Sequence, residues 1–155
     1  MPITPIHGLL SFSLAGFFTK NRNLLLLAFI AGMLPDLDGI GLLFNLSMFY
    51  AFHHELLHAP VYGLVFAVPA GLVMRKIFKE SFAKSALVFA ASFISHPLID
   101  IFFTAWPVKL LWPFSSEQFS CPVLVDYNWL LAGVVFLAAS AQILRFFGGQ
   151  PRKIA

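Results

Sequence analysis

Two ionisable residues, His96 and Asp100, lie four positions apart in residues 92–100, a stretch that is otherwise almost wholly apolar. On a helix this spacing places an imidazole and a carboxylate on one face, which is a common way to present two metal ligands. Burying such groups without a partner is costly, so their presence needs a reason. We predict that the pair binds a metal ion; a hydrogen-bonded pair that stabilises a helix bundle is the alternative.

Two carboxylates, Asp36 and Asp38, lie in the sequence LPDLDG at residues 34–39. Pro and Gly on either side are typical of a turn, in which Asp often caps a helix, so a capped loop is the alternative. Beside the histidines elsewhere in the chain, we favour metal binding by at least one of these aspartates.

Three histidines, His53, His54 and His58, precede Pro60. His54 and His58 share a face if the stretch is helical, whereas His53 and His58 would diverge by about 140°. Pro60 disfavours helical geometry at residue 59, so His58 can instead lie on the turn into the next helix. The sequence leaves open whether His53 or His54 is the ligand, and an interfacial histidine-rich loop is the alternative.

These candidate ligands are histidines and aspartates, with no thiolate among them. Such a set favours zinc, with manganese or iron as alternatives, and disfavours a structural zinc site of the cysteine type. Carboxylates that bridge can hold two ions, which suits phosphoester chemistry. Serine-hydrolase and nucleotide-binding motifs are absent from the sequence.

The composition indicates an integral membrane protein. Of the 155 residues, 59% are hydrophobic and only 11% are charged, against roughly 25% charged residues in soluble domains. This length suits one domain, so we expect residues 1–155 to form a single integral membrane domain with the lipid bilayer as its main partner. The net charge of +3 does not indicate a nucleic-acid-binding surface, because the basic residues lie between apolar segments and are not clustered on a polar surface.

Three segments are long and apolar enough to predict spanning helices: residues 127–144, residues 59–74 with an extension to residue 78, and residues 85–103. The apolar segments 8–18, 24–34 and 40–52 are each too short to span comfortably, and residues 35–39 predict a break after the second of them. The predicted fold is therefore all-α, with about three transmembrane helices plus short N-terminal helices or re-entrant segments.

Lysines and arginines predict the orientation of these helices. Residues 75–84 and the C-terminal end are basic, so both should be cytoplasmic, and Lys20 and Arg22 fit the same side. The segment 105–126 then lies outside, with Trp106 in an interfacial aromatic belt. This topology places every candidate ligand at the outer ends of its segment, including His7, which would mean little alone.

The order of these motifs resembles the YdjM-like family of predicted membrane-bound metal-dependent hydrolases. The resemblance rests on an early histidine, LPDLD at residues 34–38, the histidine cluster at 53–58, SHPLID at 95–100 and WPFS at 112–115. It covers roughly residues 5–116, and the joint pattern is specific although each motif is weak. It implies an α-helical inner-membrane protein with distant kinship to the all-α zinc-dependent phospholipase C fold.

Carried over by position, the resemblance implies site residues at His7, Asp36, Asp38, His53, His58, His96 and Asp100. The chain departs from the family pattern at His54, where Arg is usual, at Glu55, where a small residue is usual, and at Ala59, where Ser is usual. The missing Arg removes a contact for an anionic phosphate. Phospholipase C relatives use three metals, but five histidines leave none for a full third site, so we expect one or two ions.

The sequence thus predicts a membrane-bound hydrolase whose metal-activated water attacks a phosphoester or similar bond, with a lipid or lipid-linked substrate, at the outer face of the inner membrane. Asp38, His58, His96 and Asp100 would form the main catalytic site, with His7, Asp36 and His53 completing it or binding a second ion. A metal-binding or metal-transport protein without hydrolase activity is the rival, although transport predicts ligands near the bilayer midplane. A structural membrane protein with polar helix contacts is the plainest alternative.

Overall fold

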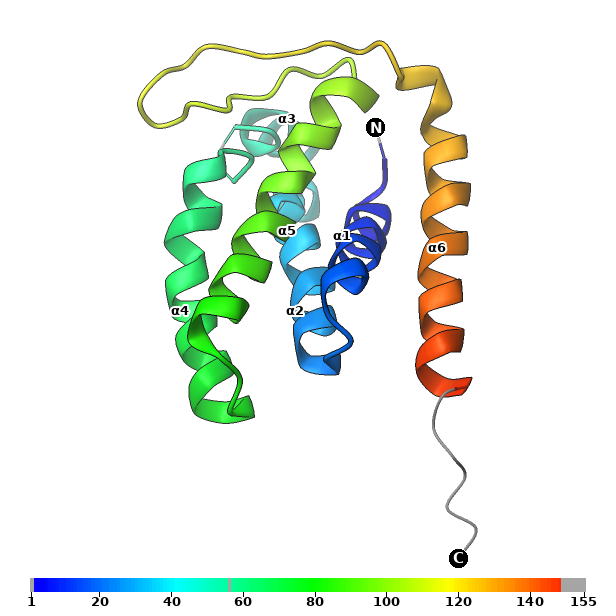
Figure 1. Cartoon of the computed structure of the whole chain (residues 1–155). Helices are drawn as coiled ribbons and strands as arrows, with labels where there is room; N and C mark the ends of the chain where they lie inside the picture. The colour runs from blue at the N-terminus through cyan, green and yellow to red at the C-terminus, as the bar shows by residue number, and fades with distance from the viewer. Residues whose placement is uncertain (1, 56, 149–155) are drawn as a thin grey trace, which may run out of the picture.

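The computed structural model describes residues 2–55 and 57–148, and that part of the chain is built from helices, as the sequence predicted. The elements in chain order are α1 (Thr4–Phe18), α2 (Arg22–Met33), the 3-10 helix η1 (Leu34–Leu43), α3 (Leu46–Phe52), α4 (Pro60–Phe78), α5 (Phe82–Phe103), the short 3-10 helix η2 (Val125–Tyr127) and α6 (Asn128–Gly148). Helices α1, α2, α4 and α5 pack into a bundle, and α6 stands at one side against α1 (Figure 1).

Among the described residues, four helical stretches are long and apolar enough to cross a membrane: Arg22–Leu43, Pro60–Phe78, Phe82–Phe103 and Val125–Arg145. Three of them match the predicted spans. The fourth refines the expectation of a break at residues 35–39: α2 ends at Met33, close to the predicted break, but the 3-10 helix η1 continues directly from it. Pro35 lies at the start of η1, where a proline needs no amide donor and its fixed φ suits a helix, so the proline extends the helical run.

The two ends of the bundle differ in chemistry. The turn between α1 and α2, the turn between α4 and α5, and the end of α6 all lie at the lower end of Figure 1. These are the parts of the chain that carry most of its lysines and arginines. The N-terminus and the long segment between α5 and α6 lie at the opposite, upper end. The basic clusters therefore gather at one end, as the sequence analysis expected.

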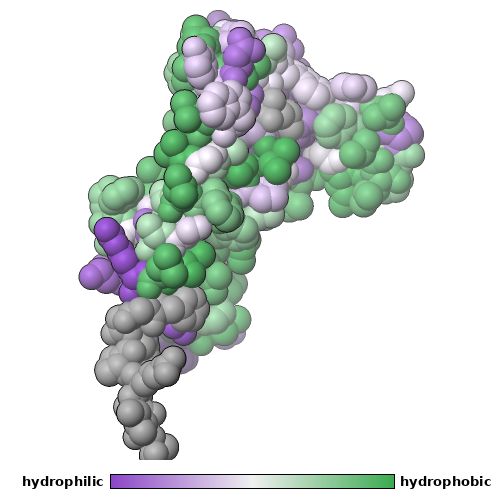
Figure 2. Space-filling view, turned by 90° about the vertical axis from the view of Figure 1, so that its right-hand side faces the viewer, coloured by the Kyte–Doolittle hydropathy of each residue, from purple (hydrophilic) through white to green (hydrophobic). Residues whose placement is uncertain are grey.

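The surface between the two ends is apolar. Large side chains of α4 and α6 are exposed, among them Leu72, Ile77 and Leu137. Figure 2 shows one face of the molecule, on which hydrophobic residues cover much of the surface and hydrophilic ones gather toward the top and the lower left of the view. Such a surface is unfavourable in water and favourable against lipid.

The close approach of α1 to α2 depends on Gly32. A β-carbon at this position would lie 2.3 Å from Ser11 Oγ and 2.8 Å from the carbonyl oxygen of His7. Only glycine leaves room for α1 here, and the contact brings the start of α1 next to the end of α2. Gly32 therefore helps to place His7 beside the residues of η1.

Candidate metal centre

Four parts of the fold bring the candidate ligands together. His7 comes from α1, Asp36 and Asp38 from η1, and His96 and Asp100 from α5. The segment between α3 and α4 supplies the three remaining histidines, His53, His54 and His58. All eight side chains are at most 5% exposed. Every residue that the sequence singled out as a ligand thus lies in one buried cluster.

Four side-chain atoms form the centre of this cluster: Asp36 Oδ1, His58 Nε2, His96 Nε2 and Asp100 Oδ2. His96 Nε2 lies 3.3 Å from Asp36 Oδ1 and 3.2 Å from Asp100 Oδ2. His58 Nε2 lies 3.6 Å and 3.7 Å from the same two oxygens. Zinc bonds of about 2.0–2.1 Å in a tetrahedron require neighbouring ligand atoms about 3.3–3.4 Å apart. Asp36, His58 and His96 offer ligand atoms within 4.8 Å of one another, and Asp100 Oδ2 lies beside both histidines, so this cluster could hold one divalent cation.

None of these four atoms has a hydrogen-bond partner among residues 2–55 and 57–148, although all are buried. A buried polar atom left unpaired costs free energy, and an unpaired buried carboxylate costs more. A cation bound between them would satisfy all four at once. The donor chemistry of the cluster, imidazole nitrogens and carboxylate oxygens, is suited to a divalent metal ion.

Hydrogen bonds on the far side of each ring orient the imidazoles. His96 Nδ1 donates to the carbonyl oxygen of Gly32 at 2.7 Å, and His58 Nδ1 donates to Asp38 Oδ2 at 2.9 Å. Because carbonyl and carboxylate oxygens only accept, the proton must sit on Nδ1 in both rings. The Nε2 lone pairs are therefore directed at the centre of the cluster, as in metal-bound histidines.

Asp38 differs from the other two aspartates. Its Oδ1 accepts from His53 Nδ1 at 2.8 Å, and its Oδ2 accepts from His58 Nδ1 and from the amide of Leu57 at 3.3 Å. Both oxygens are thus engaged in holding histidines. Asp38, which the sequence predicted as a ligand, has the contacts of a carboxylate that orients histidines.

His7 approaches the second oxygen of Asp100. Its ring stacks on His96 with 3.7 Å between the centroids, and its Nε2 lies 3.4 Å from Asp100 Oδ1. His7, His96 and Asp100 also form a group whose ligand atoms lie within 4.8 Å of one another. Asp100 therefore has one oxygen toward the four-atom centre and the other toward His7, the position of a bridging carboxylate.

Burial and neighbouring charges shift the pKa values of His54 and His58, which lie in the segment between α3 and α4, outside the spanning helices. Burial, together with the nearby His58, lowers the pKa of His54 to about 3, so its imidazole is neutral near neutral pH and can donate a lone pair. Burial also acts to lower the pKa of His58, but the carboxylates of Asp36 and Asp38 outweigh it and raise that pKa. The carboxylates around His58 therefore favour positive charge at this place, which either a proton or a metal cation can supply.

Three contacts in and around the cluster were not predicted from the sequence. The carbonyl of Gly32 carries no signal in the sequence, because any residue has a carbonyl group. Trp106, which we expect in an interfacial belt, packs against His54 and His53 with ring centroids 5.0 Å and 5.3 Å apart. Glu55 forms an ion pair with Lys109 from the same segment as Trp106. The segment after α5 thus covers the histidine cluster.

The fold and the cluster define a class: a multi-pass helical membrane protein with buried histidine and aspartate groups that can hold a metal ion. The chain matches the YdjM inner membrane protein family over residues 3–155, so it belongs to that family. Family membership and the four apolar helices together support a multi-pass location in the inner membrane. Searches of curated proteins and of solved structures gave no significant match.

Proposed function

We propose that this protein is a membrane-bound metal-dependent hydrolase that acts on a phosphoester or lipid-linked substrate. The observation that carries the proposal is the set of four buried ligand atoms without hydrogen-bond partners in the described chain, contributed by η1, the segment before α4, and α5. A fold held together by helix packing alone has no need of two aspartates and two histidines facing one another in its interior.

Asp36, His58, His96 and Asp100 would hold one ion, and His7 with Asp100 Oδ1 would contribute to a second. Two carboxylates offset the charge of a divalent cation, which favours binding in a buried site. The mixed nitrogen and oxygen ligands make zinc the first choice, with manganese and iron as alternatives. A divalent cation bound here supplies Lewis acidity, which polarises a phosphoryl oxygen and lowers the pKa of water toward neutrality.

The residues around the site would prepare it for this chemistry. Asp38 fixes the tautomer and direction of His53 and His58, and the Gly32 carbonyl does the same for His96. Burial of the ligands excludes bulk water and strengthens the electrostatic interactions inside. In this proposal Asp38 is a positioning residue, and Asp36 takes the place among the main ligands that the sequence gave to Asp38.

Two features favour a lipid or lipid-linked substrate at the outer face. The ligands come from the end of the bundle opposite the turns rich in Lys and Arg, and such turns are normally cytoplasmic. An apolar cavity of about 570 Å³ lies between α1 and α5, lined by residues such as Leu14, Phe18 and Leu87. Ser95, which directly precedes His96, also lines it, whereas Thr19 and Lys84 line it toward the basic turns, so the cavity offers room for a hydrocarbon chain alongside α5.

The test begins with the metal content of the detergent-purified protein, measured by elemental analysis for the wild type, His96→Ala and Asp100→Ala. We expect stoichiometric zinc, manganese or iron in the wild type and loss of that metal in both variants. Asp126→Ala, which removes an exposed carboxylate far along the chain, is the control and should keep the metal. A wild type without metal after reconstitution would overturn the proposal.

Hydrolysis is tested on the metal-loaded protein in lipid vesicles with phospholipids and lipid-linked phosphoesters. We expect product release that depends on the metal and is lost in His96→Ala. Full activity in that variant would overturn the assignment of the site.

Complete burial of the ligands favours the rival function, a metal-binding or metal-transport protein, because a hydrolase must admit a substrate to its ions. Zinc flux into vesicles that contain the purified protein separates the two functions. Flux with no hydrolysis would support transport, whereas hydrolysis with no flux would support the enzyme.

A further inference from the structure

His54 is not used by the proposed four-ligand set, yet its side chain is fully buried. Neither of its ring nitrogens has a hydrogen-bond partner within the described part of the chain. Its backbone adopts a left-handed conformation, with φ of 66°, which Gly and Asn adopt more easily than His. The backbone conformation therefore does not explain why residue 54 is a histidine, and its imidazole must serve another purpose.

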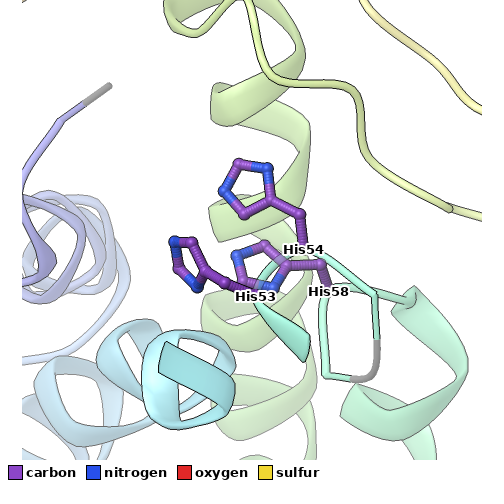
Figure 3. Close-up of side chains that lie close together, drawn as sticks. All are labelled: His53, His54 and His58. Carbon is purple, nitrogen blue, oxygen red and sulfur yellow. The ribbon is translucent and has the colours of Figure 1, made fainter. Parts of the chain in front are cut away.

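The surroundings of His54 are those of a metal ligand. Its ring centroid lies 4.5 Å from that of His53 and 4.4 Å from that of His58, and each of the three residues offers a nitrogen within 4.8 Å of the others. Figure 3 shows the three rings gathered in front of α5, with His54 uppermost. Three imidazoles at this spacing form a set suited to zinc and similar cations.

The three-histidine set and the four-ligand set share one atom. His58 Nδ1 donates to Asp38, so only its Nε2 lone pair remains for a cation. That lone pair cannot serve two ions at once. The two sets are therefore alternative positions for a single ion, with His58 common to both.

The two positions differ in depth. Trp106 is half-exposed and packs on His53 and His54, and the ring of His58 lies 5.0 Å from that of His96. The order from the covering segment inward is thus Trp106, then His53 and His54, then His58, and then His96. An ion that reaches the four-ligand set from this side meets the three histidines first.

The two positions also differ in charge. Three neutral imidazoles bring no negative charge to the cation. The nearest carboxylate oxygens, Asp36 Oδ1 at 4.0 Å from His53 Nε2 and Asp100 Oδ2 at 3.9 Å from His54 Nε2, become ligands only in the second position. In a buried site, where electrostatic interactions are strong, the set with two carboxylates binds the cation more tightly. Passage from the first position to the second is therefore favourable.

We propose that His53, His54 and His58 form an uptake site at which a divalent cation binds before it passes to Asp36, His96 and Asp100, with His58 retained throughout. The inference rests on the proposed four-ligand site. It assigns His54 the role of a transient ligand, so that its loss slows loading with little change in final affinity.

The experiment follows zinc uptake by metal-free, detergent-purified protein in a stopped-flow instrument with a fluorescent zinc indicator. His54→Gly and His54→Asn remove the imidazole and accept the left-handed backbone, so both should fold. Lys79→Gly is the matched control, because Lys79 also has a left-handed φ of 60° but lies at the end of α4. Equilibrium affinity is measured on the same samples by competition with a chelator.

We expect both His54 variants to load zinc at least about tenfold more slowly than the wild type, the effect of roughly 1.4 kcal/mol on a barrier. Their equilibrium affinity should stay within about threefold, a smaller effect than that of losing a resident ligand or its orienting partner. Lys79→Gly should load like the wild type.

Unchanged uptake in both His54 variants would overturn the uptake site while leaving the four-ligand site intact. Equilibrium affinity reduced as strongly as by His96→Ala would also overturn it, because His54 would then be a resident ligand. A wild type that binds no zinc would instead overturn the proposed function on which the inference rests.

Discussion

The chain contains two clusters of carboxylates and polar side chains at opposite ends of the bundle, and they differ in how completely they are paired. Near the basic turns, Glu80 accepts two hydrogen bonds from the Asn21 side-chain amide, at 2.9 and 2.8 Å, and one from that of Asn23 at 2.8 Å. Asn21 in turn accepts from the amides of Asn23 and Leu24 and begins α2.

At the other end, neither oxygen of Asp36 or of Asp100 has a hydrogen-bond partner in the described residues, although these side chains are buried. The Glu80 network links two turns of the chain and is complete without any further group. In the Asp36 and Asp100 cluster the carboxylate oxygens have no such partner within the described chain, which is the arrangement we expect of a site that binds a cation. This difference separates a polar network that stabilises a fold from one arranged for a ligand.

The largest effect should come from Asp36→Asn. The substitution keeps the size of the side chain but removes one of two charges that offset the cation, so zinc affinity should fall by more than about 100-fold. Glu80→Gln, the equivalent change in the paired cluster, should leave affinity unchanged. Competition with a chelator measures both, and equal losses in the two variants would remove the distinction between the clusters.

Asp38→Asn should have an intermediate effect, because Asp38 acts through His53 and His58. An amide cannot accept from both rings as a carboxylate does, so the rings lose part of their orientation. Loss of such an orienting partner typically weakens metal binding by about 10–100-fold. Isothermal titration with zinc measures the change, and a loss as complete as that in Asp36→Asn would make Asp38 a direct ligand.

Gly32→Ala should act on the approach of α1 to α2. The added methyl group would overlap Ser11 and the backbone of His7, and such overpacking typically costs about 1–3 kcal/mol. Gly133→Ala in α6 is the matched control, because a β-carbon there meets nothing within 4 Å. Unfolding in detergent should show a lowered Tm for Gly32→Ala alone, and an unchanged Tm would contradict the close contact.

The smallest effect concerns the pH dependence of the paired cluster. Hydrogen bonds from Asn23 and Asn21 hold the pKa of Glu80 below its ordinary value of 4.5. Glu80 therefore stabilises the fold above that pH, and the contribution is lost as the pH falls through the lower pKa of the folded state. The difference in Tm between the wild type and Glu80→Gln should be small near neutral pH and shrink further in acid.

A difference that grows in acid would contradict this assignment of Glu80. Metal content should be the same in the wild type and in Glu80→Gln at every pH, because Glu80 lies at the end of the bundle opposite the metal site.

Local patterns in the sequence were enough for the class of protein and for the residues that meet in the buried cluster. The apolar composition and the length of three segments predicted a helical membrane protein, because hydrocarbon demands long apolar helices. The spacing of His96 and Asp100 predicted a shared helix face, because side chains four residues apart on a helix lie one above the other. The motif order also predicted the family, to which the chain belongs.

Tertiary structure alone decided which atoms face one another. Asp36 and His96 lie sixty residues apart in the chain, and the direction of each carboxylate depends on how η1 meets α5. The same packing engages both oxygens of Asp38, continues α2 through Pro35, and sets the Gly32 carbonyl against His96. Composition and spacing indicate what chemistry a residue can perform. Its partners depend on contacts between segments that are distant in the sequence, and a local sequence pattern does not predict those contacts.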